Sequence, residues 1–166
     1  MSLLALLQTG CLILLAVLLV VAAWRDFHTL HIANSLPVAI VALYAAWSAL
    51  GWMAGTTTLE DLGSAAGCAL ALFLAGTFAF ALGMMGGGDV KLAAATGLFA
   101  GPALIMDFVL ITAVAGGLLG LGVLMGLPLG IVSGSGAATA RGRLNRRLPY
   151  GPAIAAGGLW LVAALT

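Results

Sequence analysis

The sequence predicts an all-α, polytopic membrane protein with about six transmembrane helices, in a single domain that covers residues 1–166. Of these residues, 63% are apolar and 7% are charged, and the mean hydropathy is +1.22. A soluble domain carries about a quarter charged residues. So few charged side chains could not cover the surface of a water-soluble globule. A lipid bilayer must therefore be the solvent for most of the chain.

Uncharged runs between the charged residues locate the expected helices, because a helix needs about 20 apolar residues to cross roughly 30 Å of hydrocarbon. The runs place helices near residues 3–24, 35–54, 62–83, 90–106, 108–131 and 149–165. The first run lacks a preceding basic segment and is longer than the apolar part of a signal peptide, so we expect it to be retained. The fourth is short, at roughly 25 Å, and spans only with local thinning of the bilayer or with Lys91 reaching to the interface.

Every lysine and arginine falls in a loop that this threading places on one side. The loops are residues 25–34, 84–91 and 132–148, and the residues are Arg25, Lys91, Arg141, Arg143, Arg146 and Arg147. The positive-inside rule assigns that side to the cytoplasm and both termini to the outside. We expect the four clustered arginines to anchor their loop to anionic lipid. No broad basic face is present, which argues against nucleic acid as a partner.

Glycines spaced four apart are expected to let helices approach closely in lipid. The pairs are Gly63/Gly67, Gly116/Gly120 and Gly122/Gly126. The two cysteines lie in apolar runs without a neighbouring Cys or His, so the sequence indicates neither a zinc site nor a disulfide.

Two acidic residues stand out, because ionisable groups near a membrane are costly and are candidates for function. Asp26 and Asp89 both lie at the cytoplasmic ends of expected helices, so they could meet although they are far apart in sequence. Two carboxylates that share one proton can activate a water and protonate a leaving amine. The alternative is that Asp26 pairs with Arg25 while Asp89 caps its helix.

Three glycines, Gly86, Gly87 and Gly88, precede Asp89. Their missing side chains let a substrate backbone approach the carboxylate and let the chain bend before the next helix. A flexible turn without a role in binding is the alternative.

The other ionisable groups are expected to be structural. Glu60 and Asp61 lie just before a helix and Asp107 lies at an outer boundary. Metal binding by Asp26 with His28 and His31 is disfavoured, because a helix would not place all three side chains on one face. We therefore expect no metal site and no cofactor.

Two stretches resemble elements of the type IV prepilin peptidases. Asp26-Phe-His-Thr-Leu-His-Ile-Ala-Asn34 is similar to the D-x5-I-P-N element, and Gly86-Gly-Gly-Asp-Val-Lys91 is similar to G-x-G-D-x-K. Pro149-Tyr-Gly-Pro152 is similar to a third feature. The resemblance implies an intramembrane aspartyl protease that cuts the short, basic leader from a prepilin or pseudopilin. It places cleavage at the cytoplasmic face of the bacterial inner membrane, with Asp26 and Asp89 as the catalytic pair.

The resemblance also implies supporting roles around the substrate for Gly86, Gly87, Gly88, Lys91 and Asn34. Lys91 matches the motif lysine and acts either as a topology anchor that reaches the interface or electrostatically near Asp89. Asn34 is expected to cap or turn the chain into the helix that begins near residue 35.

The sequence departs from the family pattern in two places. Ala33 stands where proline is usual, which makes the turn before Asn34 less rigid. The cytoplasmic segment with paired, zinc-binding cysteines that bifunctional members carry is not seen. The chain therefore resembles the short form found with tight-adherence (Flp-type) pili, and we expect cleavage without methylation. Presenilin-like proteases share the G-x-G-D string, but there a tyrosine precedes the first aspartate, in place of Arg25.

The main alternative function is a small proton- or ion-coupled transporter that uses Asp26 and Asp89 to bind ions. Transporters usually show paired repeats and acids at the midplane. Both acids here are expected near one interface, which favours the protease. A non-catalytic assembly subunit is the third class, and it would tolerate replacement of either aspartate.

Overall fold

The computed structural model describes residues 3–29, 32–125 and 150–166, and within them the secondary structure consists of five helices without a strand. The helices are α1 (Leu3–Thr29), α2 (Ser35–Met53), α3 (Leu59–Ala81), α4 (Gly87–Leu124) and α6 (Gly151–Leu165). The first four are long and apolar enough to cross a membrane, whereas α6 is shorter. The all-α, polytopic class is confirmed, but the number of six spans is not.

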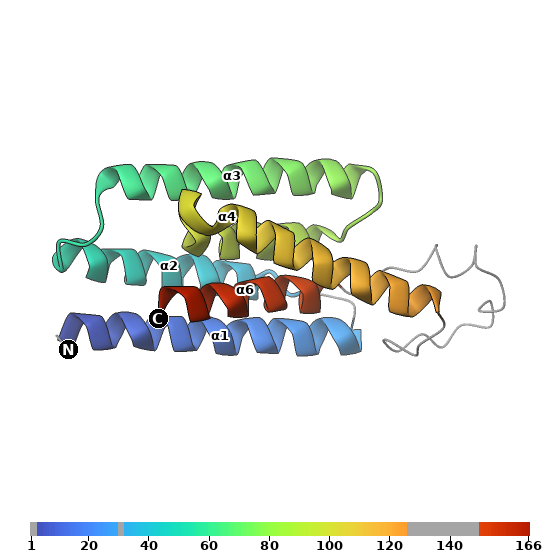
Figure 1. Ribbon diagram of the computed structural model, residues 1–166, viewed down its shortest axis with the longest axis horizontal. Helices are drawn as coiled ribbons and strands as arrows, with labels where there is room; N and C mark the ends of the chain where they lie inside the picture. The colour runs from blue at the N-terminus through green and yellow to red at the C-terminus, as the bar shows by residue number, and fades with distance from the viewer. Residues whose placement is uncertain (1–2, 30–31, 126–149) are drawn as a thin grey trace.

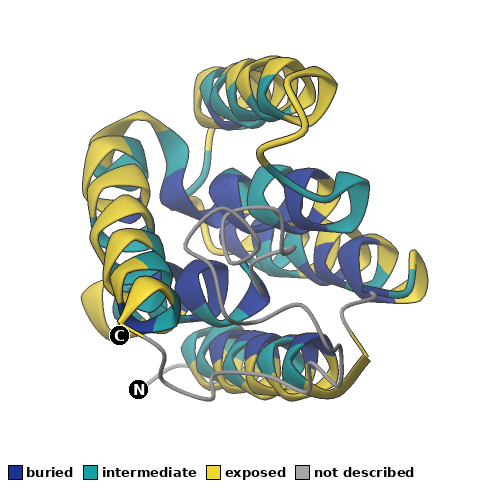
Figure 2. Cartoon of the chain, turned by 90° about the vertical axis from the view of Figure 1, so that its right-hand side faces the viewer, coloured by how far each residue is buried: buried dark blue, intermediate teal, exposed yellow. Residues whose placement is uncertain are grey.

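The helices lie side by side along one axis (Figure 1). α6 packs between α1 and α4, α2 packs against α1 and α4, and α3 packs mainly against α4. Buried residues face the middle of the bundle and exposed residues face outward (Figure 2). Large apolar side chains on the outside, such as Trp24 at 68% exposed and Met106 at 75%, fit lipid as the surrounding solvent.

Helix α4 reverses direction within its length. Gly101 has φ 53° and ψ −170°, and Pro102 follows it. A positive φ favours glycine, and proline cannot continue the helical hydrogen bonds of the preceding turn. The first segment (87–100) and the second segment (102–124) consequently run in opposite directions (Figure 1).

The expected helix break near Asp107 was wrong. Asp107 lies inside the second segment of α4, and its side chain is exposed. The helix does not break at a charged residue; the break comes from the backbone chemistry of the uncharged pair Gly101-Pro102. The end of the expected 108–131 helix, the 132–148 loop with its four arginines, and Pro149 lie outside the described residues.

Glycines do let helices approach closely, but some of the glycines that do so differ from the expected pairs. A Cβ at Gly63 or Gly67 would meet nothing within 4 Å among the described residues, so this expected packing pair faces open space. Close contacts occur at other glycines, among them two adjacent ones in α6. A Cβ at Gly157 would meet the second segment of α4, and a Cβ at Gly158 would lie 2.5 Å from Leu19 of α1.

Replacing Gly157 with Ala is expected to destabilise the protein by about 1–3 kcal/mol, the usual effect of overpacking. The added methyl group would lie 3.0 Å from the backbone oxygen of Phe108, which cannot rotate away, and would also meet Thr112. Thermal unfolding in detergent measures the effect. Gly63→Ala is the matched control, because it adds the same group to a helix where it meets nothing. Equal melting temperatures for the two variants would contradict the close packing of α6.

Candidate active site

Asp26 lies on the buried face of α1. Leu15, Leu19, Ala22 and Asp26 are all buried and follow one another at steps of three or four residues, which is the spacing of one helix face. The side chain of Asp26 is 4% exposed. Its Oδ2 accepts a hydrogen bond of 2.8 Å from the backbone N–H of Gly151, the first residue of α6.

Gly151 is held against Asp26 so closely that no side chain fits between them. A Cβ at this position would lie 2.7 Å from Cβ and 2.8 Å from Oδ2 of Asp26. The positive end of the α6 dipole therefore points at the carboxylate. The sequence placed Gly151 in a motif but did not reveal this bond. The sequence feature that could have indicated the bond is the pair Gly151-Pro152 at the start of α6. A glycine there has a backbone N–H that no side chain covers.

Asp89 lies in the first turn of α4 and is 7% exposed. Its Oδ2 accepts a hydrogen bond of 3.2 Å from the backbone N–H of Gly86. A Cβ at Gly86 would lie 2.7 Å from the same oxygen. Asp89 thus caps its helix, as one of the two alternatives expected, but it uses only one carboxylate oxygen to do so. The other oxygen, Oδ1, is buried and has no hydrogen-bond partner among the described residues.

The packing of α6 between α1 and α4 brings the two aspartates to the same end of the bundle. Their carboxylates lie near enough to interact electrostatically. Each accepts a hydrogen bond from a glycine N–H at the start of a helix. Arg25 is exposed, whereas Asp26 is buried and bonded to Gly151. The arrangement is a buried pair of carboxylates held by two backbone donors.

Residues 32–34, which lead into α2, contact the first turns of α4. Lys91 Nζ donates a hydrogen bond of 2.9 Å to Asn34 Oδ1. A Cβ at Gly88 would lie 3.0 Å from Cβ of Ile32, so a larger residue would push this segment away. Gly87 has an ordinary contact with Phe80. These contacts hold the start of α2 beside the start of α4.

Of the two roles expected of Asn34, the side-chain cap of α2 is wrong, whereas the residue does lie in the turn that leads into α2. Its φ of −58° and ψ of −20° are helical, and its side chain makes no capping hydrogen bond. A capping residue usually has extended dihedrals. In this structure Lys91 engages the carboxamide oxygen that would have capped the helix.

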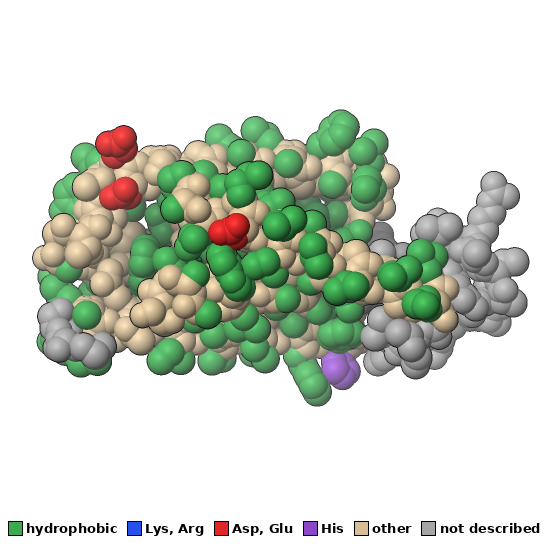
Figure 3. All heavy atoms as spheres, in the orientation of Figure 1, with side chains coloured by type: hydrophobic (Ala, Val, Ile, Leu, Met, Phe, Trp, Pro, Cys, Tyr) green, Lys and Arg blue, Asp and Glu red, His purple; other side chains and the backbone are tan. Residues whose placement is uncertain are grey.

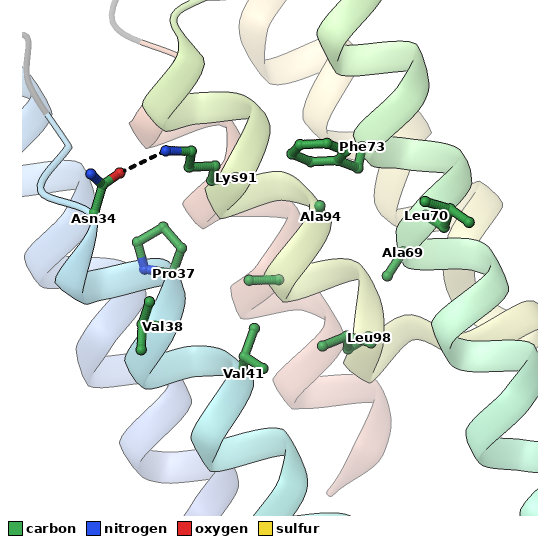
Figure 4. A pocket seen from close by; sticks show the side chains of 11 residues that line it. Asn34, Pro37, Val38, Val41, Ala69, Leu70, Phe73, Lys91, Ala94 and Leu98 are labelled. Carbon is green, nitrogen blue, oxygen red and sulfur yellow. Dashed lines mark hydrogen bonds between the residues drawn. The ribbon is translucent and has the colours of Figure 1, made fainter.

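Lys91 lies on the face of α4 away from Asp89, because two residues correspond to about 200° around a helix. It lines a groove of about 510 Å³ between α2, α3 and α4, with Asn34 at the same end (Figure 4). The rest of the lining is apolar. Lys91 therefore lies beside Asn34, just before α2, and at one end of the groove.

His28 is exposed, and its Nδ1 lies 2.8 Å from the carbonyl oxygen of Trp24. Its ring also lies against the ring of Trp24, with centroids 4.5 Å apart. His31 lies outside the described residues. Within the part of the chain that the structure describes, no three His, Cys, Asp or Glu side chains gather in a group that could hold a metal ion.

Comparison with known proteins identifies the family. Residues 13–121, which include both Asp26 and Asp89, match the type IV leader peptidase family. The chain belongs to the type IV leader peptidase family. This confirms the resemblance seen in the sequence.

A curated leader peptidase is also similar to the chain. The prepilin leader peptidase/N-methyltransferase of Bacillus subtilis (strain 168) is 33% identical over 148 residues, which are 86% of this chain and 50% of the relative. The chain thus spans about half the length of that relative. No solved structure gave a significant match.

Proposed function

We propose that this chain is a membrane-embedded aspartic endopeptidase that cleaves the leader peptide of type IV prepilins or pseudopilins. The observation that carries the proposal is the pair of buried aspartates, Asp26 and Asp89, each oriented by a glycine N–H at a helix start. Membership in the type IV leader peptidase family and the printed name of the Bacillus relative support the same activity.

The two carboxylates divide the proton transfers of peptide hydrolysis. One carboxylate takes a proton from water while the water oxygen attacks the peptide carbonyl carbon. The other carboxyl group is protonated, and it gives its proton to the leaving nitrogen as the C–N bond breaks. Oδ1 of Asp89 is available for this chemistry, because Oδ2 is already engaged by Gly86.

The proposal places the enzyme in the bacterial inner membrane with Asp26 and Asp89 toward the cytoplasm. Arg25 and Lys91 lie at the aspartate end of the bundle, whereas Glu60 lies in the first turn of α3, at the other end. Positive charges favour the cytoplasmic side. Residues 86–88 bring no side chains to the start of α4, so we assign them to the approach of the substrate backbone.

Co-expression with a prepilin encoded in the same genome tests the activity. In a host without another prepilin peptidase, the prepilin is expected to lose its leader and to migrate as a smaller protein when this chain is present. The same prepilin expressed alone is the control. An unchanged prepilin beside membrane-inserted protein would contradict the proposed function.

We expect the mature pilin to carry an unmethylated N-terminus. The Bacillus relative is named for two activities, whereas the two described cysteines of this chain, Cys11 and Cys68, lie in separate helices and do not form the paired set that bifunctional members carry. Mass spectrometry of the processed pilin decides the point, because one methyl group adds a defined mass. A pilin methylated by this chain alone would contradict the prediction without affecting the peptidase proposal.

A further inference from the structure

The hairpin formed by the two segments of α4 extends less far from the aspartate end than its neighbour α3. Gly97 lies beside Leu72 of α3 and Ile105 of the second segment, so these three residues share one level. From that level α3 continues to Leu59, over roughly 20 Å at 1.5 Å per residue. The α4 hairpin continues only to Gly101, over roughly 6 Å. Figure 1 shows this reversal well inside the length that α1 and α3 cover.

The first segment of α4 is also too short to cross a bilayer. Its 87–100 range corresponds to roughly 21 Å, against roughly 30 Å of hydrocarbon. At its end, Gly101 has non-helical dihedrals, Pro102 carries no backbone N–H, and the side chains of Pro102 and Ala103 are exposed. Lipid-exposed backbone of this kind is not tolerated in hydrocarbon, because a helix end leaves polar groups without partners.

A carboxylate lies close to this reversal on an outward face. Asp107 is exposed, and its neighbours Met106 and Leu110 are exposed apolar residues at 75% and 62%. On the face drawn in Figure 3, acidic atoms are exposed at one end of the molecule and also farther along it, among hydrophobic side chains. An ionised aspartate within hydrocarbon costs about 2.5–3.5 kcal/mol even on insertion scales. The α4 hairpin thus has an exposed backbone turn and a charged side chain at a depth in the membrane where the neighbouring helix α3 is apolar.

We propose that the bilayer is thinned beside the α4 hairpin, on the side opposite the aspartate pair, so that water and lipid headgroups reach residues 101–107. Water there satisfies the open turn and solvates Asp107, while the apolar faces of α1 and α3 keep the full thickness elsewhere. Thinning of the bilayer around a short segment is the ordinary response to hydrophobic mismatch. The inference depends on membrane insertion and not on peptidase activity, so the two proposals fail separately.

Cysteine labelling at matched depths tests the proposal. Asp107 and Leu74 each lie two residues beyond the shared level of Ile105 and Leu72, and Leu74 is 60% exposed on α3. Asp107→Cys and Leu74→Cys are made after Cys11 and Cys68 are replaced by Ala. A membrane-impermeant, charged maleimide is then added to right-side-out and to inside-out vesicles.

The Asp107→Cys thiol is expected to react at least about tenfold faster than Leu74→Cys, because the reactive thiolate needs contact with water. It should react from the side opposite the aspartate pair. Ala103→Cys is expected to react similarly, and it retains the Asp107 charge. Labelling after denaturation confirms that all three thiols are present. Equal rates for Asp107→Cys and Leu74→Cys, or reaction only from the aspartate side, would overturn the proposal.

Discussion

Replacing Asp26 or Asp89 with Asn is expected to abolish leader cleavage while the protein still inserts into the membrane. Asn has nearly the same shape, and its amide oxygen can still accept the N–H of Gly151 or Gly86, so the local contacts are retained. It cannot take up or release the proton that hydrolysis requires. Proton transfer by a positioned group contributes about 10²–10⁴-fold to a rate, so the loss should be at least 10²-fold. The measurement is the rate of prepilin processing by purified protein.

Two exposed acids provide matched controls. Glu60→Gln and Asp107→Asn remove a carboxylate outside the buried pair and should leave processing near the parental rate. Either aspartate variant, shown to be folded and still processing prepilin at that rate, would exclude the two-carboxylate mechanism. Loss of cleavage on chelation, restored by added metal, would support ion binding by these aspartates instead.

Much of the site could be predicted because its causes are local to the sequence. The composition alone requires a membrane protein. If each apolar run crosses the bilayer once, the loop after the first run and the loop before the fourth lie on the same side. The spacing of Leu19, Ala22 and Asp26 puts the carboxylate on the buried face of α1. A buried acid in an apolar helix also needs a polar partner, and this holds for Asp89 in the first turn of α4 as well.

The rest depended on contacts that no local pattern encodes. The reversal at Gly101 does not coincide with a charged residue, so dividing the chain at its charges does not reveal it. Asn34 has the residue type of a cap, yet Lys91, 57 residues away, engages its oxygen. The donor to Asp26 is a backbone N–H, which every residue except proline carries, so only its placement in space by α6 distinguishes Gly151.

Replacing Gly151 with Ala is expected to lower the kcat of leader cleavage by about 10²-fold, the scale of effect that a misplacement of about 1 Å produces. The variant keeps the N–H donor, but its Cβ would lie 2.7–2.8 Å from atoms of Asp26, so α6 or the carboxylate must move. The contact lies within the protein, between α6 and Asp26 of α1, so we expect KM to change little. The measurement is a kinetic comparison with purified protein, together with thermal unfolding to confirm the fold.

Gly116→Ala is the matched control for Gly151→Ala. It adds a methyl group against another face of α6, the one that packs against α4, at 3.6 Å from Tyr150 and Ala153, which is ordinary contact. Gly86→Ala is expected to behave like Gly151→Ala, because its Cβ would lie 2.7 Å from Oδ2 of the other aspartate, Asp89. If both aspartates depend on their glycine donors, Gly86→Ala and Gly151→Ala lower kcat together while Gly116→Ala does not. Parental kcat in a folded Gly151→Ala protein would mean that the start of α6 has no part in orienting Asp26.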